Sequence, residues 1–95
     1  MNSLSEFKNS LTFDTAPNNL SPQLLSLWYD GKGDWKKAHD QVDHLSDKDS
    51  AWVHAYLHRK EGDLWNADYW YARAKKIRPN ISLENEWSDL VLQFL

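Results

Sequence analysis

The sequence has no cysteine, which excludes disulfide bonds, thiolate metal ligands and a cysteine nucleophile. Its three glycines are too few for a glycine-rich phosphate-binding loop, and no Gly-x-Ser-x-Gly motif marks a nucleophilic serine. These absences predict a protein that is not an enzyme and holds no cofactor. A chain without cysteine is also typical of a reducing compartment, so we expect a cytoplasmic location.

The sequence also lacks long apolar runs. No segment approaches the roughly 20 apolar residues of a membrane-spanning helix. The segment from Met1 to Asn19 has no basic stretch followed by an apolar one, as a signal peptide would. The formal net charge is −3, and a basic segment at 59–78 lies between two acidic ones. Since nucleic-acid-binding domains are usually net basic, we expect neither a membrane nor a nucleic acid as partner.

What the sequence does contain is the pattern of an all-α protein. Of its 95 residues, 41% are hydrophobic and 14% aromatic, enough for one core, and no alternating strand pattern of useful length is present. We therefore predict a single α-helical domain over residues 1–95. Capping residues and glycine or proline turns predict a short helix after Ser3 and further helices at about 22–30, 34–45, 50–61, 64–77 and 83–94.

Two turns in the sequence repeat each other. A glycine and an aspartate are followed by an aromatic residue and an alanine in both turns, and the second turn comes 29 residues after the first, with its glycine at position 62 against 33. A repeat of this size points to stacked helical hairpins, each of which needs a neighbour to bury its apolar face. The matching segments are Gly33-Asp34-Trp35-Lys36-Lys37-Ala38 and Gly62-Asp63-Leu64-Trp65-Asn66-Ala67.

The second hairpin is similar to the tetratricopeptide repeat. Residues that follow that motif are Ala55, His58, Gly62, Ala67, Tyr71, Ala74 and Pro79 in the second hairpin, and more loosely Leu25, Ser26, Tyr29, Gly33, Ala38, Val42 and Leu45 in the first. The 29-residue offset is shorter than the family's usual repeat, and Ser50 stands where the motif closes with proline. The stretch from Trp52 to Tyr71 also resembles a group of small uncharacterised bacterial proteins, which implies no activity.

The resemblance implies a particular architecture. Two tetratricopeptide-like helical hairpins, at about 22–45 and 50–77, would form a right-handed helical array. A capping helix at about 83–94 and a flanking N-terminal helix would complete the domain. Because about three repeats are typical of a self-sufficient array, we expect both flanking helices to be integral to a compact six-helix fold.

Tetratricopeptide arrays bind partners on the face formed by the first helix of each hairpin. By resemblance, the partner-binding residues are Trp52, Tyr56 and Arg59 from the third helix and Gln23, Leu27 and Asp30 from the second. Trp, Tyr and Arg dominate interaction hot spots. The resemblance thus implies a non-enzymatic interaction or scaffold module for a protein or peptide. The alternative is that the N-terminal helix covers this face.

The helix expected at 64–77 is apolar nearly all round, which indicates that it is central or covered. Trp65 and Tyr69 form a second stripe beside its core stripe. Either the last helix covers such a stripe, or an exposed aromatic patch meets a partner or a second copy of the chain. The second interpretation predicts a homodimer and a homo-oligomeric accessory role.

Four residues could bind a metal ion. His54, His58 and Glu61 are spaced by four and three residues, so they share one face of a helix, and His39 lies on the preceding helix. Imidazoles and a carboxylate are suitable zinc ligands, which supports the hypothesis of a metal-binding or metal-dependent hydrolytic protein. The other interpretation is that the histidines are interior residues hydrogen-bonded to carboxylates or backbone.

Overall fold

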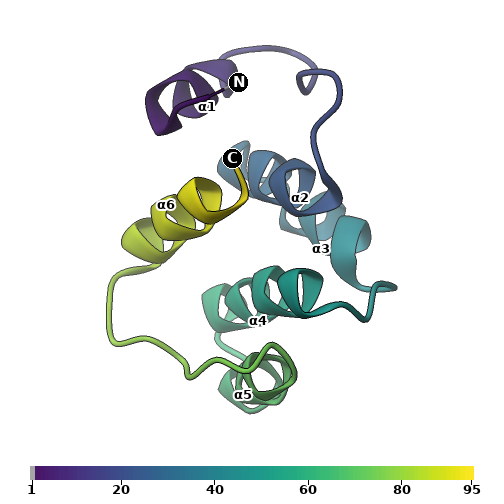
Figure 1. The fold of residues 1–95 in the computed structure, drawn as a ribbon, viewed down its shortest axis with the longest axis vertical. Coiled ribbons are helices and arrows are strands. Elements are labelled where there is room, and N and C mark those ends of the chain that lie inside the picture. Colours follow the sequence, from purple (N-terminus) through teal and green to yellow (C-terminus); the bar gives the residue numbers. More distant parts are fainter. Residues whose placement is uncertain (1) are drawn as a thin grey trace.

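The computed structural model describes residues 2–95, which form six α-helices and no strand. The all-α prediction is therefore confirmed for this part of the chain. No helix among these residues combines the length and the apolar character that a bilayer crossing requires. The helices are α1 (Leu4–Ser10), α2 (Pro22–Gly31), α3 (Trp35–Val42), α4 (Lys48–Glu61), α5 (Leu64–Arg73) and α6 (Leu83–Phe94) (Figure 1).

Each helix is preceded by an N-cap residue whose side chain accepts a hydrogen bond from a backbone amide of the first turn. In α4 this residue is Asp47, which accepts from the amide of Ser50 at 3.0 Å, so α4 begins at Lys48, before the predicted start at Ser50. The other caps lie where the sequence predicts them or directly before a predicted start: Ser3, Ser21, Asp34, Asp63 and Ser82.

Three helices end in the same left-handed turn. Gly33, which follows α2, and Gly62, which follows α4, adopt φ angles of 86° and 88°, and Lys75, which follows α5, adopts 61°. At the end of α5 the amide of Lys76 donates to the carbonyl of Tyr71 at 2.9 Å, which closes the helix. Hence α5 ends at Arg73 and not near residue 77 as predicted. Helix α3 ends at Val42, also before its predicted end.

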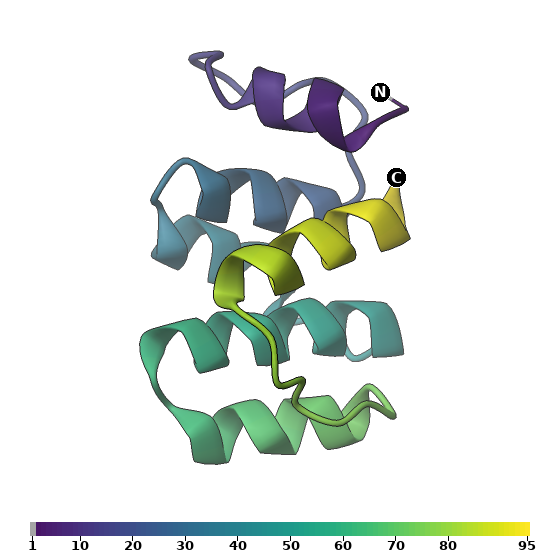
Figure 2. The same cartoon turned by 90° about the vertical axis from the view of Figure 1, so that its left-hand side faces the viewer.

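The helices pack mainly as sequential neighbours, α2 with α3 and α4 with α5. In Figure 2 α1 lies at one end of the molecule and α5 at the other, while α6 crosses the side and contacts α1, α2 and α4. The radius of gyration is 12.3 Å, close to the roughly 12 Å of a compact chain of this length. The large core side chains include Phe7, Leu27, Trp28, Tyr56, Leu57, Tyr71, Trp87 and Leu90.

Candidate functional site

The face predicted to bind a partner is covered by α6. Leu27 and Tyr56 are buried at its centre, and the indole nitrogen of Trp87 on α6 donates to the carbonyl of Leu27 at 2.9 Å. The N-terminal helix, expected as the alternative cover, contacts α6 through Phe7 and Trp87, whose ring centroids lie 5.8 Å apart, and contacts α2 through Trp28, whose indole nitrogen donates to the carbonyl of Ser10 at 3.2 Å. The groove thus holds a helix of the same chain.

Asp30, another predicted partner-binding residue, is a buried carboxylate between α2 and α4. It accepts hydrogen bonds from the Tyr56 hydroxyl at 2.6 Å and from Lys60 Nζ at 2.8 Å. Burial, followed by the charge of Asp30, raises the pKa of Tyr56 above its ordinary value. The tyrosine therefore stays protonated and acts as a permanent donor to the carboxylate.

Arg59 joins a second buried carboxylate of the same kind. Its Nη1 donates to Oε1 of Glu86 on α6 at 2.8 Å, while the Tyr71 hydroxyl donates to Oε2 at 2.6 Å. A further Arg59 nitrogen donates to the carbonyl of Ile81. Burial and then the hydrogen bond to Glu86 raise the pKa of Tyr71. One carboxylate therefore links α4, α5 and α6.

The last two residues predicted for this face also make internal contacts. Trp52 lies between Phe94, at a ring-centroid distance of 5.9 Å, and Lys76, whose Nζ is 4.3 Å from the indole centroid. Gln23 donates to Ser50 Oγ at 2.8 Å. What α6 leaves open is a pocket of about 480 Å³ beside Asp30 and Tyr56, lined further by Lys8, Lys60, Glu84 and Trp87.

The histidines of α3 and α4 lie together in the structure. Nε2 of His39 is 3.0 Å from Nε2 of His54, and the ring of His58 lies 4.8 Å from that of His54 and 5.2 Å from that of His39. Trp70 stacks on His54 with centroids 4.0 Å apart, and Trp35 stacks on His39 at 4.9 Å. The indoles of Trp35 and Trp70 therefore pack against the histidine cluster.

Burial and repulsion between the rings favour the uncharged forms of His39 and His54. Burial, followed by the neighbouring His39 and His58, lowers the pKa of His54 to about 4. Burial, followed by His58, also lowers the pKa of His39. Among the described residues, the buried Nδ1 of His54 has no hydrogen-bond partner. At neutral pH His39 and His54 therefore present neutral imidazoles, the form that binds metal ions.

Glu61 lies outside the ring of histidines. Its Oε1 accepts from Nδ1 of His58 at 2.8 Å, and the other ring nitrogen of His58 lies 3.4 Å from Asn66 Nδ2. On the α3 side, Asp43 Oδ2 is 3.8 Å from Nδ1 of His39. The structure therefore brings together the three histidines predicted to converge and places Glu61 behind one of them.

The outer face of α5 carries the exposed aromatic residues. Trp65 is 80% exposed and Tyr69 is 47% exposed, and their rings stack with centroids 6.5 Å apart. The guanidinium of Arg73 lies over the Tyr69 ring at 5.8 Å. Helix α5 packs mainly on α4 and lies at the end of the stack of helices (Figure 2). The exposure of these side chains places them on the surface at that end.

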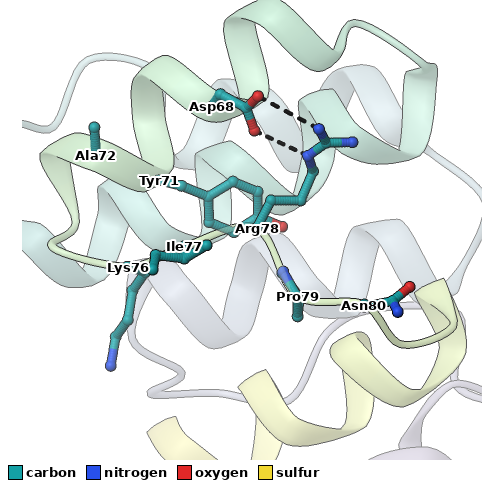
Figure 3. A pocket seen from close by; sticks show the side chains of 8 residues that line it. All are labelled: Asp68, Tyr71, Ala72, Lys76, Ile77, Arg78, Pro79 and Asn80. Carbon is teal, nitrogen blue, oxygen red and sulfur yellow. Dashed lines mark hydrogen bonds and ion pairs between the residues drawn. The ribbon is translucent and has the colours of Figure 1, made fainter.

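A shallow pocket of about 450 Å³ borders this face where the chain leaves α5 for α6 (Figure 3). Arg78 reaches back to Asp68 with Nε 2.9 Å from Oδ1, which neutralises both charges. Ile77 is 90% exposed beside it. The pocket therefore combines an apolar side chain and a neutralised ion pair with the polar side chains of Lys76 and Asn80.

Comparisons with protein-family models, curated proteins and solved structures return no match to this chain.

Three members of these clusters, Lys60, Trp70 and Glu86, were not predicted from the sequence. A local pattern could have predicted the role of Glu86. It lies three residues after Leu83 and four before Leu90, on the apolar side of its helix, where a buried carboxylate needs a hydrogen-bond partner. No local signal exists for Lys60, whose partner is 30 residues away.

Proposed function

We propose that this protein is a non-enzymatic interaction module that self-associates through the outer face of α5. One observation carries the proposal: Trp65, a residue type typical of hot spots, is 80% exposed on a helix at the end of the stack. Soluble proteins seldom leave so large an apolar side chain in water beside a second exposed aromatic unless a surface covers it. The partner-binding face on Trp52, Tyr56 and Arg59 stays a prediction, and a ligand there would have to displace α6.

The spacing on α5 supports a second copy of the chain as the occupant. Trp65, Tyr69 and Arg73 follow each other at intervals of four, so they share one stripe. In an antiparallel pair of α5 helices related by a twofold axis at Tyr69, Trp65 of each protomer faces Arg73 of the other. Two intermolecular cation–π contacts would then flank a tyrosine pair, which is the self-complementarity that a twofold interface requires.

A scaffold role by homodimerisation is therefore the function we favour. One face of a short helix buries less than a stable dimer typically does, so we expect a dimer with a micromolar Kd. The tetratricopeptide-like relationship of the hairpins, their right-handed winding and a cytoplasmic location fit this role and stay predictions.

Sedimentation velocity across a concentration series tests self-association. Wild-type protein is expected to shift toward a dimer as concentration rises, and Trp65→Arg to stay monomeric. The matched control is Leu92→Arg, which places the same charge at an exposed apolar residue of α6 and should leave the dimer intact.

Combining Trp65→Arg with Arg73→Trp tests the antiparallel register. The double variant exchanges the two members of each intermolecular pair and is expected to restore the dimer. A wild-type protein that stays monomeric up to millimolar concentration contradicts the proposal. A dimer that tolerates Trp65→Arg contradicts the assigned face.

A further inference from the structure

The geometry points to a zinc site formed by His39, His54 and His58. This inference is independent of self-association, because its residues lie between α3 and α4 and share no member with the outer face of α5. Three imidazoles from two helices supply nitrogen ligands, and no thiolate is available in a chain without cysteine. Such a donor set suits zinc.

The distances are close to those of a zinc centre. Zinc–nitrogen bonds are about 2.0–2.1 Å long, so two ligands of a tetrahedral ion lie about 3.3 Å apart. The Nε2 atoms of His39 and His54 are 3.0 Å apart, and one ring nitrogen of each of the three residues lies within 4.8 Å of the others. Small rotations of the rings would bring the three nitrogens to ligand distance.

Carboxylates lie behind two of the three rings. Glu61 accepts from Nδ1 of His58 at 2.8 Å, which fixes the proton on Nδ1 and leaves the lone pair on Nε2. Nε2 lies 3.4 Å from Asn66 Nδ2 and would exchange this long contact for the metal. Asp43 lies 3.8 Å from Nδ1 of His39 and can take the same role there. These two carboxylates would also balance the two positive charges of the zinc ion, because imidazole ligands contribute no negative charge.

The site has a route to solvent and a free ligand position. The side chain of His39 is 23% exposed, whereas His54 and His58 are buried. An ion would arrive past His39, and water would complete the fourth position. Trp35 and Trp70, stacked on His39 and His54, would report binding through their fluorescence.

Calorimetric titration of zinc into protein prepared with a chelator and without a histidine tag tests the site. We expect one equivalent of zinc per chain. His54→Gln should weaken binding at least about 100-fold, and Glu61→Gln about tenfold through loss of the outer carboxylate. The matched control is His44→Gln, since His44 is the fourth histidine of the chain and is exposed, and it should change the Kd less than about twofold.

Two further measurements keep the test decisive. His54 is buried, so far-UV circular dichroism must show that His54→Gln is folded; if it is not, His39→Gln, at a partly exposed position, takes its place. Cobalt(II) added instead of zinc should give the visible bands of a four-coordinate ion. Less than half an equivalent of zinc on folded wild-type protein, unchanged affinity in His39→Gln, or loss of binding in His44→Gln would overturn the inference.

Discussion

The hydroxyl of Tyr71 on α5 donates a 2.6 Å hydrogen bond to Glu86 on α6, inside a cluster that Arg59 completes from α4. The carboxylate is buried and carries one neutral and one charged donor. Asp30 repeats this arrangement with Tyr56 and Lys60. In both places a tyrosine and a cation stabilise a carboxylate that would otherwise be costly to bury.

Removing the Glu86 carboxylate should therefore destabilise the fold strongly. We expect Glu86→Ala to lower the free energy of unfolding by about 3–5 kcal/mol, because it leaves the Arg59 charge without its carboxylate and the buried Tyr71 hydroxyl without an acceptor. Tyr71→Phe should cost only about 1–2 kcal/mol. Urea denaturation measures both values. Equal, small losses in the two variants would show that the cluster contributes little.

The left-handed residue behind α5 predicts a stabilising substitution. Lys75 has a φ of 61°, where the structurally equivalent Gly33 and Gly62 carry no Cβ strain. Lys75→Gly should raise the free energy of unfolding by about 0.5–1 kcal/mol and the Tm by about 4 °C. Lys75→Ala is the control, since it removes the charge and keeps the strained Cβ. A similar gain in both variants would point to charge instead of backbone strain.

Two tryptophans are expected to differ in their contribution to stability. The indole nitrogen of Trp35 donates to the carbonyl of Leu57 on α4 at 2.7 Å, whereas Trp65 is exposed. Trp35→Phe should cost about 1–2 kcal/mol through the lost hydrogen bond, and Trp65→Phe less than about 0.5 kcal/mol. Thermal unfolding of dilute protein, where self-association is absent, gives both values. The reverse order would contradict the packing described for α3 and α4.

Acid should destabilise the metal-free protein through the histidine cluster. His54 has a pKa of about 4 when folded and 6.5 as a reference value, so the unfolded chain binds more protons between these limits. Stability is then full above pH 6.5 and falls as the pH drops toward 4. We expect His54 to account for about 2 kcal/mol of the loss between pH 7.5 and 4.5.

The titratable groups around His54 define the control for that experiment. His39 faces it from α3, Asp43 from the residue after α3 and His58 from α4, while α5 contributes Trp70, which does not titrate. Urea denaturation at the two pH values, in buffer with a chelator, should show the smaller acid loss in His54→Gln. The same pH dependence in both proteins would exclude His54 as its origin.

Much of the fold could be read from the sequence because its signals are local. Ser21 before Pro22 and the glycines at 33 and 62 act within a few residues, and they placed helix ends correctly. The end of α5 was misplaced because a lysine takes the left-handed position that normally indicates glycine. The start of α4 was misplaced because Asp47, not a later residue, caps it.

The histidine cluster could be predicted from the sequence, whereas the cover formed by α6 and the donors of the Glu86 cluster could not. His54 and His58 share a helix face by their spacing, and His39 joins them through the packing of consecutive helices, so their proximity could be anticipated. The position of α6 could not, because the bond from Trp87 to Leu27 spans 60 residues. Glu86 and its donors come together only once α6 is in place.

The position of α6 after α2 to α5 in the chain has a consequence for synthesis. The ribosome releases α2 to α5 before α6, and domains begin to fold as they emerge. During that interval Arg59 and Tyr71 lack their carboxylate, and Leu27 lies at the surface of the nascent chain. A helix made after them therefore completes the interior of α2 to α5, and a chain stalled before Leu83 would expose the groove to chaperones or to other nascent chains.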